Sequence, residues 1–345
     1  QIKFSFGEAR KFYERVIDLA PTIEHRFNYA CLLQRLNDFE KARSHYEEVL
    51  RILRELSKQN PEAYLPDVAM SLTNLGNLLL NTNELEQARA CYEESLALHR
   101  ELSEQNPEAY LPDVAGSLNN LGTLLQGTNE LQRACDCYEE ALEIYRELFE
   151  QDPGAYKPDV AMTLNNLGYS LEKAHDLKRA QAYYEDALKL YRELSEQNPE
   201  AYKPNVAMVL NNLGGLLAYT NELQQAQVYY EEALQIRRKL SEQNPEAYKL
   251  GVAMVLNNLT LLYLIVEEQE EAEKAYQEAH DIYQKLASHH PRAYEINYAK
   301  LLVIGFDLLG KPKEYLEEAK EILGKYPEHP KAQELLSIIE QLDKR

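Results

Sequence analysis

Asparagine side chains recur in this sequence at a fixed position of a repeated segment. One asparagine precedes a Leu-Gly pair or its counterpart, and in most copies a second asparagine precedes the first. An amide both donates and accepts hydrogen bonds, so a row of amides can pair with the backbone N–H and C=O groups of an extended peptide. The candidate peptide-binding residues of this kind are Asn74, Asn119, Asn120, Asn165, Asn166, Asn211, Asn212, Asn257 and Asn258.

A second interpretation of these asparagines is that they tie neighbouring helices together, because a structural contact of that kind would also repeat. Both interpretations stay open at the level of sequence. Selectivity for a ligand would come from groove positions that vary between the copies. The candidates are Tyr169, Glu172, Lys173, Tyr219 and Leu264.

Other residues with chemical potential do not form a recognisable site. Gly305 to Lys311 fits the Gly-x4-Gly-Lys spacing of a phosphate loop, but Pro312 follows where Ser or Thr would hold magnesium. Cys135 and Cys137 lie two residues apart on one predicted helix, on different faces, so they are not a metal-ligand pair. No nucleophile is paired with a base. We therefore expect no metal, no cofactor and no enzymatic activity.

The elements that would position the asparagines belong to a long internal repeat. Successive prolines, each after Asn or a related residue, are 46 residues apart without insertion: Pro61, Pro107, Pro153, Pro199, Pro245 and Pro291. In the first long copy, Pro66 suits the first turn of a helix, and the apolar residues after it recur at steps of three and four. A turn at residues 81–83 and a second helix over about 84–105 follow.

The residues on these two helices resemble the tetratricopeptide repeat. The first helix of the repeat, helix A, carries Leu72, Leu75-Gly76 and Leu79. The second helix, helix B, carries Ala88, Tyr92 and Ser95. Glycine recurs in register at 76, 122, 168 and 214, whereas the last long copy has Thr260. A helical glycine costs about 1 kcal/mol relative to alanine, so we expect close approach of helix B through the small Ala88-type position. The amino-acid sequence of the repeat resembles the long repeats of kinesin light chains and of prokaryotic tetratricopeptide arrays.

The resemblance implies an all-α fold: a right-handed superhelical solenoid of antiparallel helix pairs with 46-residue repeats, in which helix A lines a concave groove. We attribute the length beyond the usual 34 residues to an extended helix B. A single solenoid over 1–345 is expected, with a partial repeat (1–21), a divergent repeat (22–60), five long repeats (61–292), a short terminal repeat (293–327) and a capping helix (328–345). Because the chain begins within a repeat, we expect it to be a piece of a longer protein.

Composition limits the partners. Glycine and proline are scarce, at 13 and 14 residues, and the formal net charge is −20. A strongly acidic chain disfavours nucleic acid and anionic membranes as partners. No run approaches the roughly 18 apolar residues of a membrane span. Four cysteines without a disulfide-type pattern favour a reducing, cytoplasmic location.

These observations predict a non-catalytic scaffold that holds an extended peptide or partner segment in an asparagine-lined groove. In peptide-binding relatives, matching asparagines contact the peptide backbone, and the resemblance implies the same here. The partner would be a protein, a peptide or another domain of the same longer chain. One alternative is a sensor or partner-recognition segment of a multidomain signalling protein, for example a signal-transduction ATPase. Another is a structural element for self-assembly.

Overall fold

The computed structural model describes residues 6–344, and all regular secondary structure within them is α-helical. The chain divides into two compact units, which meet between Tyr183 and Tyr184 within helix α9 (Leu177–Gln197). Each unit is described separately below.

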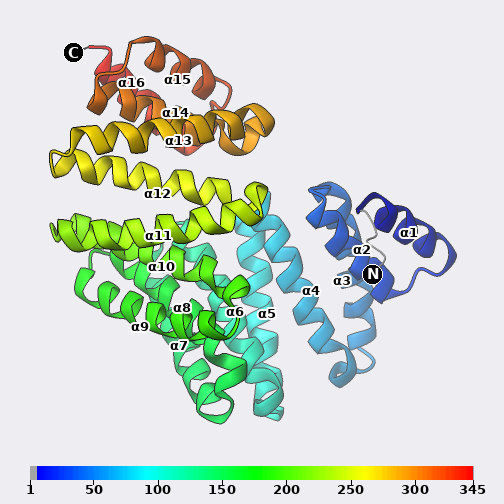
Figure 1. Cartoon of the computed structure of the whole chain (residues 1–345). Helices are drawn as coiled ribbons and strands as arrows, with labels where there is room; N and C mark the ends of the chain where they lie inside the picture. Colours follow the sequence, from blue (N-terminus) through cyan, green and yellow to red (C-terminus); the bar gives the residue numbers. More distant parts are fainter. Residues whose placement is uncertain (1–5, 345) are drawn as a thin grey trace. The chain divides into compact units, whose positions relative to one another are not determined.

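The first unit consists of α1 to α8 and the start of α9. Its complete helices are α1 (Phe6–Leu19), α2 (Ile23–Arg35), α3 (Phe39–Ser57), α4 (Pro61–Asn81), α5 (Leu85–Gln105), α6 (Pro107–Gly127), α7 (Leu131–Gln151) and α8 (Pro153–Lys173). Each helix packs mainly against its neighbours in the sequence. Helices α4, α6 and α8, the A helices of three repeats, also touch one another in turn. Figure 1 shows α4 to α7 as a series of antiparallel neighbours.

The second unit contains the rest of α9 and seven further helices. These are α10 (Pro199–Tyr219), α11 (Leu223–Gln243), α12 (Pro245–Ile265), α13 (Gln269–His289), α14 (Pro291–Leu309), α15 (Glu314–Gly324) and α16 (Pro330–Leu342). Helices α10 to α15 again pack in sequence order, and α16 packs on α14 and α15 (Figure 1). The predicted all-α class, with helix pairs in 46-residue repeats, is confirmed.

From α5 onwards in the long repeats, a single residue joins helix B to the next helix A. The backbone N–H of Asn106 donates to the Leu102 carbonyl and closes α5, while its side chain accepts from the N–H of Ala109 and caps α6. Helix A therefore begins at Pro107, whose missing N–H is harmless at the first helical position. The same caps are Asn60, Asp152, Asn198 and Asn244.

This cap corrects two expectations. Helix α4 begins at Pro61, and Pro66 lies inside it instead of at its first turn. Because Asn60 caps the helix, the helix begins at Pro61, more than one turn before Pro66. Helices α4 and α5 both contain 21 residues, so the repeat is not long through helix B alone. Both helices extend past the usual length.

The turn from helix A to helix B uses one residue in the left-handed backbone region. Asn83 has φ 64°, and the next N–H, that of Glu84, donates back to the Leu79 carbonyl. Asparagine tolerates this conformation better than most residues. Asn37, Asn129 and Asn221 repeat the arrangement, and histidine, which occupies the position at His175, also favours this region. Glu267 occupies the same position without that advantage.

The helical glycines make room for a tyrosine of helix B. A Cβ atom on Gly76 would lie 2.6 Å from Cε1 of Tyr92, which is a steric clash. Gly122 faces Tyr138 and Gly214 faces Tyr230 in the same way. The expectation that the small Ala88-type position explains the glycines is therefore wrong, because the nearest atoms belong to the aromatic ring.

The last long repeat departs from this pattern. Thr260 is buried where the other copies have glycine, and the Tyr276 ring lies instead against Gly305 of α14. Gly310 then ends α14 in the left-handed region, and Lys311 pairs with Glu273. The residues that match a phosphate-loop spacing thus serve packing and helix termination.

The B helices carry ion pairs between successive repeats. Arg100 Nη2 lies 2.5 Å from Glu140 Oε1, and residues 40 positions apart are paired in the same way at Arg54–Glu94, Arg192–Glu232 and Arg238–Glu278. These side chains are largely exposed, as expected for the outer face. Each such pair contributes at most about 1 kcal/mol. The exposed glutamates therefore also connect neighbouring repeats.

Helix α12 contradicts the expectation that no segment is long and apolar enough to cross a bilayer. By length and composition alone, Pro245–Ile265 meets that requirement. In the structure it is a repeat helix that packs between α11 and α13, with 39% of its most apolar window buried. The core helix of a folded repeat passes the same test.

Candidate functional site

One face of helix A carries three kinds of side chain at helical spacing. In α4 these are Asp67, Met70 and Asn74, at positions i, i+3 and i+7, which share a face of an α-helix. Asn74 and its counterparts Asn120 and Asn166 are half-buried, whereas Met70 is 45% exposed. The corresponding residues are Asp113, Gly116 and Asn120 in α6, and Asp159, Met162 and Asn166 in α8.

A pocket of about 450 Å³ lies between α4 and α6 in the first unit. Asn74 and Asn120 both line it, so the structure brings these two predicted residues together. Asp67, Met70 and Asp113 also line it, and so do His99 of α5 and Tyr145 of α7. Its chemistry therefore combines amides, carboxylates and an apolar thioether.

Buried neutral groups of helix B complete this pocket. The Nδ1 atom of His99 lies 2.8 Å from the hydroxyl of Ser117, which is itself buried. Burial lowers the pKa of His99 from 6.5, so the ring is neutral at neutral pH. Burial likewise raises the pKa of Tyr145 and keeps its hydroxyl protonated. The charge of the pocket therefore comes from Asp67 and Asp113, which are exposed.

The asparagine one residue earlier on helix A is more deeply placed. Asn119 is 4% exposed, and its Nδ2 atom donates to the Thr163 hydroxyl of α8 at 2.9 Å. Asn165 is 5% exposed, and its amide donates to Asn166 at 3.4 Å. In this unit Asn119 and Asn165 therefore make contacts within the protein, whereas Asn74 and Asn120 line the pocket between α4 and α6.

The second unit contains the remaining predicted asparagines. Asn258 of α12 donates to Oδ1 of Asn211 in α10 at 2.9 Å, which joins two A helices. Asn212 is half-buried on α10. Asn257 and Asn258 line a pocket of about 160 Å³ with Met254, Tyr283, Asn297, Lys300, Leu301 and Lys331. Lys331 of α16 donates to Asn297 at 3.3 Å.

The predicted selectivity positions lie near the ends of helix A. Lys173 Nζ is 5.1 Å from the ring centroid of Tyr169, a cation–π geometry that fixes two of them against each other. Tyr219, the last residue of α10, is 67% exposed. Glu172 and Leu264 are half-buried.

Comparison with known proteins gives the family. Sequence models described as tetratricopeptide repeat match residues 67–147 and 113–193, and others of the same description match 28–62, 206–246 and 252–292. This chain belongs to the tetratricopeptide repeat family. No curated protein matches it.

Solved structures agree on the fold of this tetratricopeptide repeat chain. The apo form of RapI is 17% identical with a TM-score of 0.62, and the alignment covers 91% of this chain and 98% of RapI. BtubC (BKLC) from P. vanneervenii is 24% identical with a TM-score of 0.59, over 73% and 94% of the two chains. The apo quorum sensor NprR from B. thuringiensis is 15% identical with a TM-score of 0.59, over 97% and 93%. At these identities the likeness establishes the fold.

Sequence reasoning missed the methionines of this repeat array. The chain has four, Met70, Met162, Met208 and Met254, and all stand at the same position of helix A. Met162 and Met254 are 38% and 49% exposed. Methionine is flexible and polarizable, and it is frequent on binding surfaces that accept varied apolar groups. The 46-residue spacing that revealed the asparagines could have revealed these residues too.

Metal chemistry has no support in the described part of the chain, residues 6–344. No group of three or more His, Cys, Asp or Glu side chains there is arranged to hold a metal ion. Burial raises the pKa values of Cys91, Cys135 and Cys137 to about 11, which leaves these thiols protonated and unreactive at neutral pH.

Proposed function

We propose that this chain is a non-catalytic scaffold that binds an extended protein segment along the A helices of its repeats. The observation that carries the proposal is that Asn74 and Asn120, from successive repeats, line one pocket of about 450 Å³. Their amides pair with peptide backbone, which makes recognition tolerant of sequence. The neighbouring Met70 supplies adaptable contact to apolar peptide side chains.

The predicted asparagines take two roles in this proposal. In the first unit Asn120 and Asn166 join Asn74 as peptide contacts, and in the second unit Asn212 is a peptide contact. Asn119 and Asn165 are buried; Asn119 braces α6 against α8, and Asn165 holds the amide of Asn166 in place. In the second unit Asn257 and Asn258 contact the ligand from the pocket that they line, with Asn211 as the bracing partner of Asn258.

Selectivity is assigned to the exposed ends of the A helices. Tyr169 and Lys173 act as a pair, because the ammonium group lies over the ring. Tyr219 offers a large exposed aromatic surface, which suits an apolar or cationic peptide side chain. The carboxylates along α4 and α6 disfavour nucleic acid and anionic lipid as partners. Free thiols suit the cytoplasm.

A pooled library of capped ten-residue peptides tests this function. Peptides retained by the native chain are labelled, and their binding is measured by fluorescence anisotropy. Loss of two amide–backbone bonds removes about 2 kcal/mol, so Asn74→Ala/Asn120→Ala should bind about 30-fold more weakly. The control, Gln87→Ala/Gln132→Ala, removes two exposed amides from the B helices of the same repeats and should bind like the native chain.

Equal binding by the native chain and by Asn74→Ala/Asn120→Ala would contradict a role for these amides. Thermal melts of all the variants show whether the fold is kept. Weaker binding by Gln87→Ala/Gln132→Ala would indicate that the peptide binds to the B helices instead.

A second candidate function is a sensor segment of a larger signalling protein. The observation in its favour is the likeness to NprR, a quorum sensor whose structure aligns with 97% of this chain. In this version the same groove binds a signal peptide, and flanking domains respond to it. Limited proteolysis of the full-length natural protein with and without a retained peptide distinguishes the two. Protection that extends outside these 345 residues supports the sensor.

A further inference from the structure

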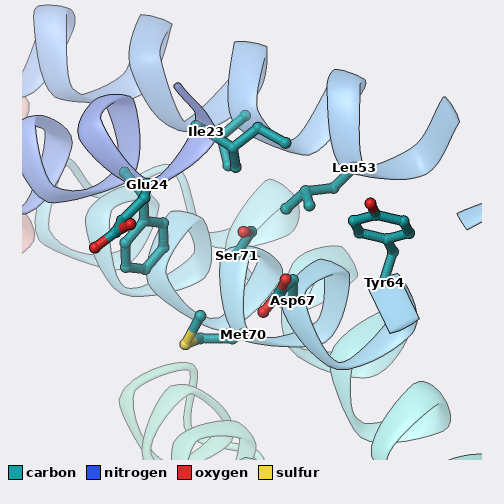
Figure 2. A pocket seen from close by; sticks show the side chains of 9 residues that line it. Ile23, Glu24, Leu53, Tyr64, Asp67, Met70 and Ser71 are labelled. Carbon is teal, nitrogen blue, oxygen red and sulfur yellow. The ribbon is translucent and has the colours of Figure 1, made fainter. Parts of the chain in front are cut away.

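A second pocket in the first unit lies where α2, α3 and α4 meet. Its volume is about 290 Å³, near the lower end for ligand pockets, which suits one side chain better than a whole small molecule. Figure 2 shows the labelled side chains of the three helices around the hydroxyl of Ser71. The lining residues are Ile23, Glu24 and Phe27 from α2, Val49 and Leu53 from α3, and Tyr64, Asp67, Met70 and Ser71 from α4.

The Ser71 hydroxyl in this pocket has no hydrogen-bond partner among the described residues, although it is 1% exposed. The neighbouring repeat explains why. There Ser117 occupies the same position and pairs with His99, but Leu53 stands at the position of His99 one repeat earlier. A buried hydroxyl without a partner costs about 1–3 kcal/mol. A ligand that offers a hydrogen-bond donor would recover that cost.

The charged residues that line the pocket are both acidic. Glu24 and Asp67 are exposed carboxylates, and none of the nine lining residues is basic. The walls are apolar, formed by Ile23, Val49 and Leu53 among others. A lysine side chain matches this combination, since it has a four-carbon apolar stem and an ammonium group with three donors.

We propose that this pocket binds a lysine side chain of the peptide held by the scaffold. The stem lies against the apolar walls, and the ammonium group donates to Asp67 and Ser71. Glu24 at the mouth attracts the charge during encounter. The inference rests on the proposed function, because Asp67 and Met70 also line the pocket that contains Asn74 and Asn120. A peptide across α4 can therefore reach both.

Methyl-labelled methionine provides the test, because the chain has only four methionines and Met70 is the one that lines this pocket. The probes are three capped pentapeptides of alanine with lysine, norleucine or glutamate in the middle. They are titrated to millimolar concentration into the full chain. We expect the lysine peptide to shift the Met70 methyl resonance and to bind at least ten-fold more tightly than the norleucine peptide.

Three variants locate the interaction. Glu24→Gln/Asp67→Asn should abolish the preference for lysine, whereas Glu62→Gln/Glu86→Gln removes the same charge from exposed positions that line neither pocket and should keep it. Leu53→His reproduces the neighbouring repeat. It should give Ser71 a partner, narrow the pocket and remove the preference for the lysine peptide over the norleucine peptide while the chain stays folded.

The possible outcomes distinguish a failure of the lysine pocket from a failure of the proposed peptide binding. If the lysine peptide shifts Met162 or Met254 but not Met70, the lysine pocket is wrong and groove binding stands. Equal affinity for lysine and norleucine peptides overturns recognition of the charge. If no peptide shifts any of the four methyl groups, both the lysine pocket and peptide binding along the A helices are overturned.

Discussion

Gly122 and Tyr138 occupy complementary space at the centre of one repeat. A Cβ atom on Gly122 would lie 2.8 Å from Cε1 and 2.9 Å from Cζ of the tyrosine ring. Real Cβ atoms do not approach ring carbons so closely. The ring is fully buried and its hydroxyl lies 3.0 Å from the hydroxyl of Thr123, so it has little freedom to move. This contact, repeated along the chain, sets how closely helices A and B approach.

Gly122→Leu should therefore destabilise the protein by about 2–3 kcal/mol through overpacking, measured as a lower urea midpoint. Gly127→Leu is the matched control. Gly127 ends the same helix, it is exposed, and a Cβ atom added to it would have no neighbour within 4 Å. That change should lie within about 0.5 kcal/mol of the native chain. An unchanged midpoint for Gly122→Leu would refute the close contact.

Glu267 is a second position where the repeat departs from its own pattern. It has φ 63° at the turn before α13, where four other copies have asparagine. Because asparagine tolerates the left-handed region better, Glu267→Asn should raise the free energy of unfolding by about 0.5–1 kcal/mol. Glu267→Gln removes the same charge and keeps the strain, so it should have no such effect. Chemical denaturation measures the free energy of unfolding of both variants. Equal stabilisation by both would mean that the gain comes from removal of the charge and not from relief of backbone strain.

The fold could be predicted from the sequence because every copy repeats the same solution. The prolines at steps of 46, the Leu-Gly pairs and the small and aromatic residues of helix B fixed the helix pairs and their order. The sequence pattern predicts the start of helix A five residues too late, because Pro66 resembles a first-turn proline when the Asn60 cap is not considered. The error arises because Pro61 and Pro66 both suit the first turn of a helix, and only the Asn60 cap distinguishes them.

The candidate site was only partly predictable. The period revealed the asparagines, but not which row is buried, because adjacent residues point in different directions and only packing decides. The lysine pocket was beyond sequence reasoning. It depends on Leu53 replacing a histidine and leaving Ser71 without a partner, a relationship between residues 18 positions apart that appears only when the helices are packed.

His99 makes stability depend on pH. Burial lowers its pKa below 6.5, so between those two values the unfolded chain binds more protons than the folded one. The contribution of neutral His99 is complete above pH 6.5 and is lost as pH falls from there towards its lowered pKa. One proton gives a slope of at most about 1.4 kcal/mol per pH unit.

His99→Tyr tests this dependence, because tyrosine occupies the same position at 145, 191 and 283. The urea midpoints of the native chain and the variant are compared at intervals between pH 8 and 5. The native chain should lose more stability than the variant over the acidic part of that range. Parallel curves would mean that His99 is protonated in the folded state as readily as in the unfolded one.

Deletion of residues 61–106 should leave a folded protein that is one repeat shorter. Asn60 would then precede Pro107 and could cap α6 as it now caps α4. Arg54, now 2.6 Å from Glu94, would meet Glu140 at the equivalent position. Since each repeat packs mainly on its neighbours, the stability lost is that of one repeat and its interfaces. Circular dichroism should show unchanged helix content per residue, and urea unfolding should stay cooperative.

The same deletion also carries a consequence for binding. Tyr110, Asp113 and Ser117 would take the places of Tyr64, Asp67 and Ser71 beside α2 and α3. Ser117 would lose His99 and face Leu53, so the pocket for a lysine side chain would form again from different residues. The shortened chain should therefore keep its preference for the lysine pentapeptide over the norleucine one, measured by isothermal calorimetry. Loss of that preference in a folded, cooperative variant would mean that recognition depends on Met70, which has no counterpart at Gly116.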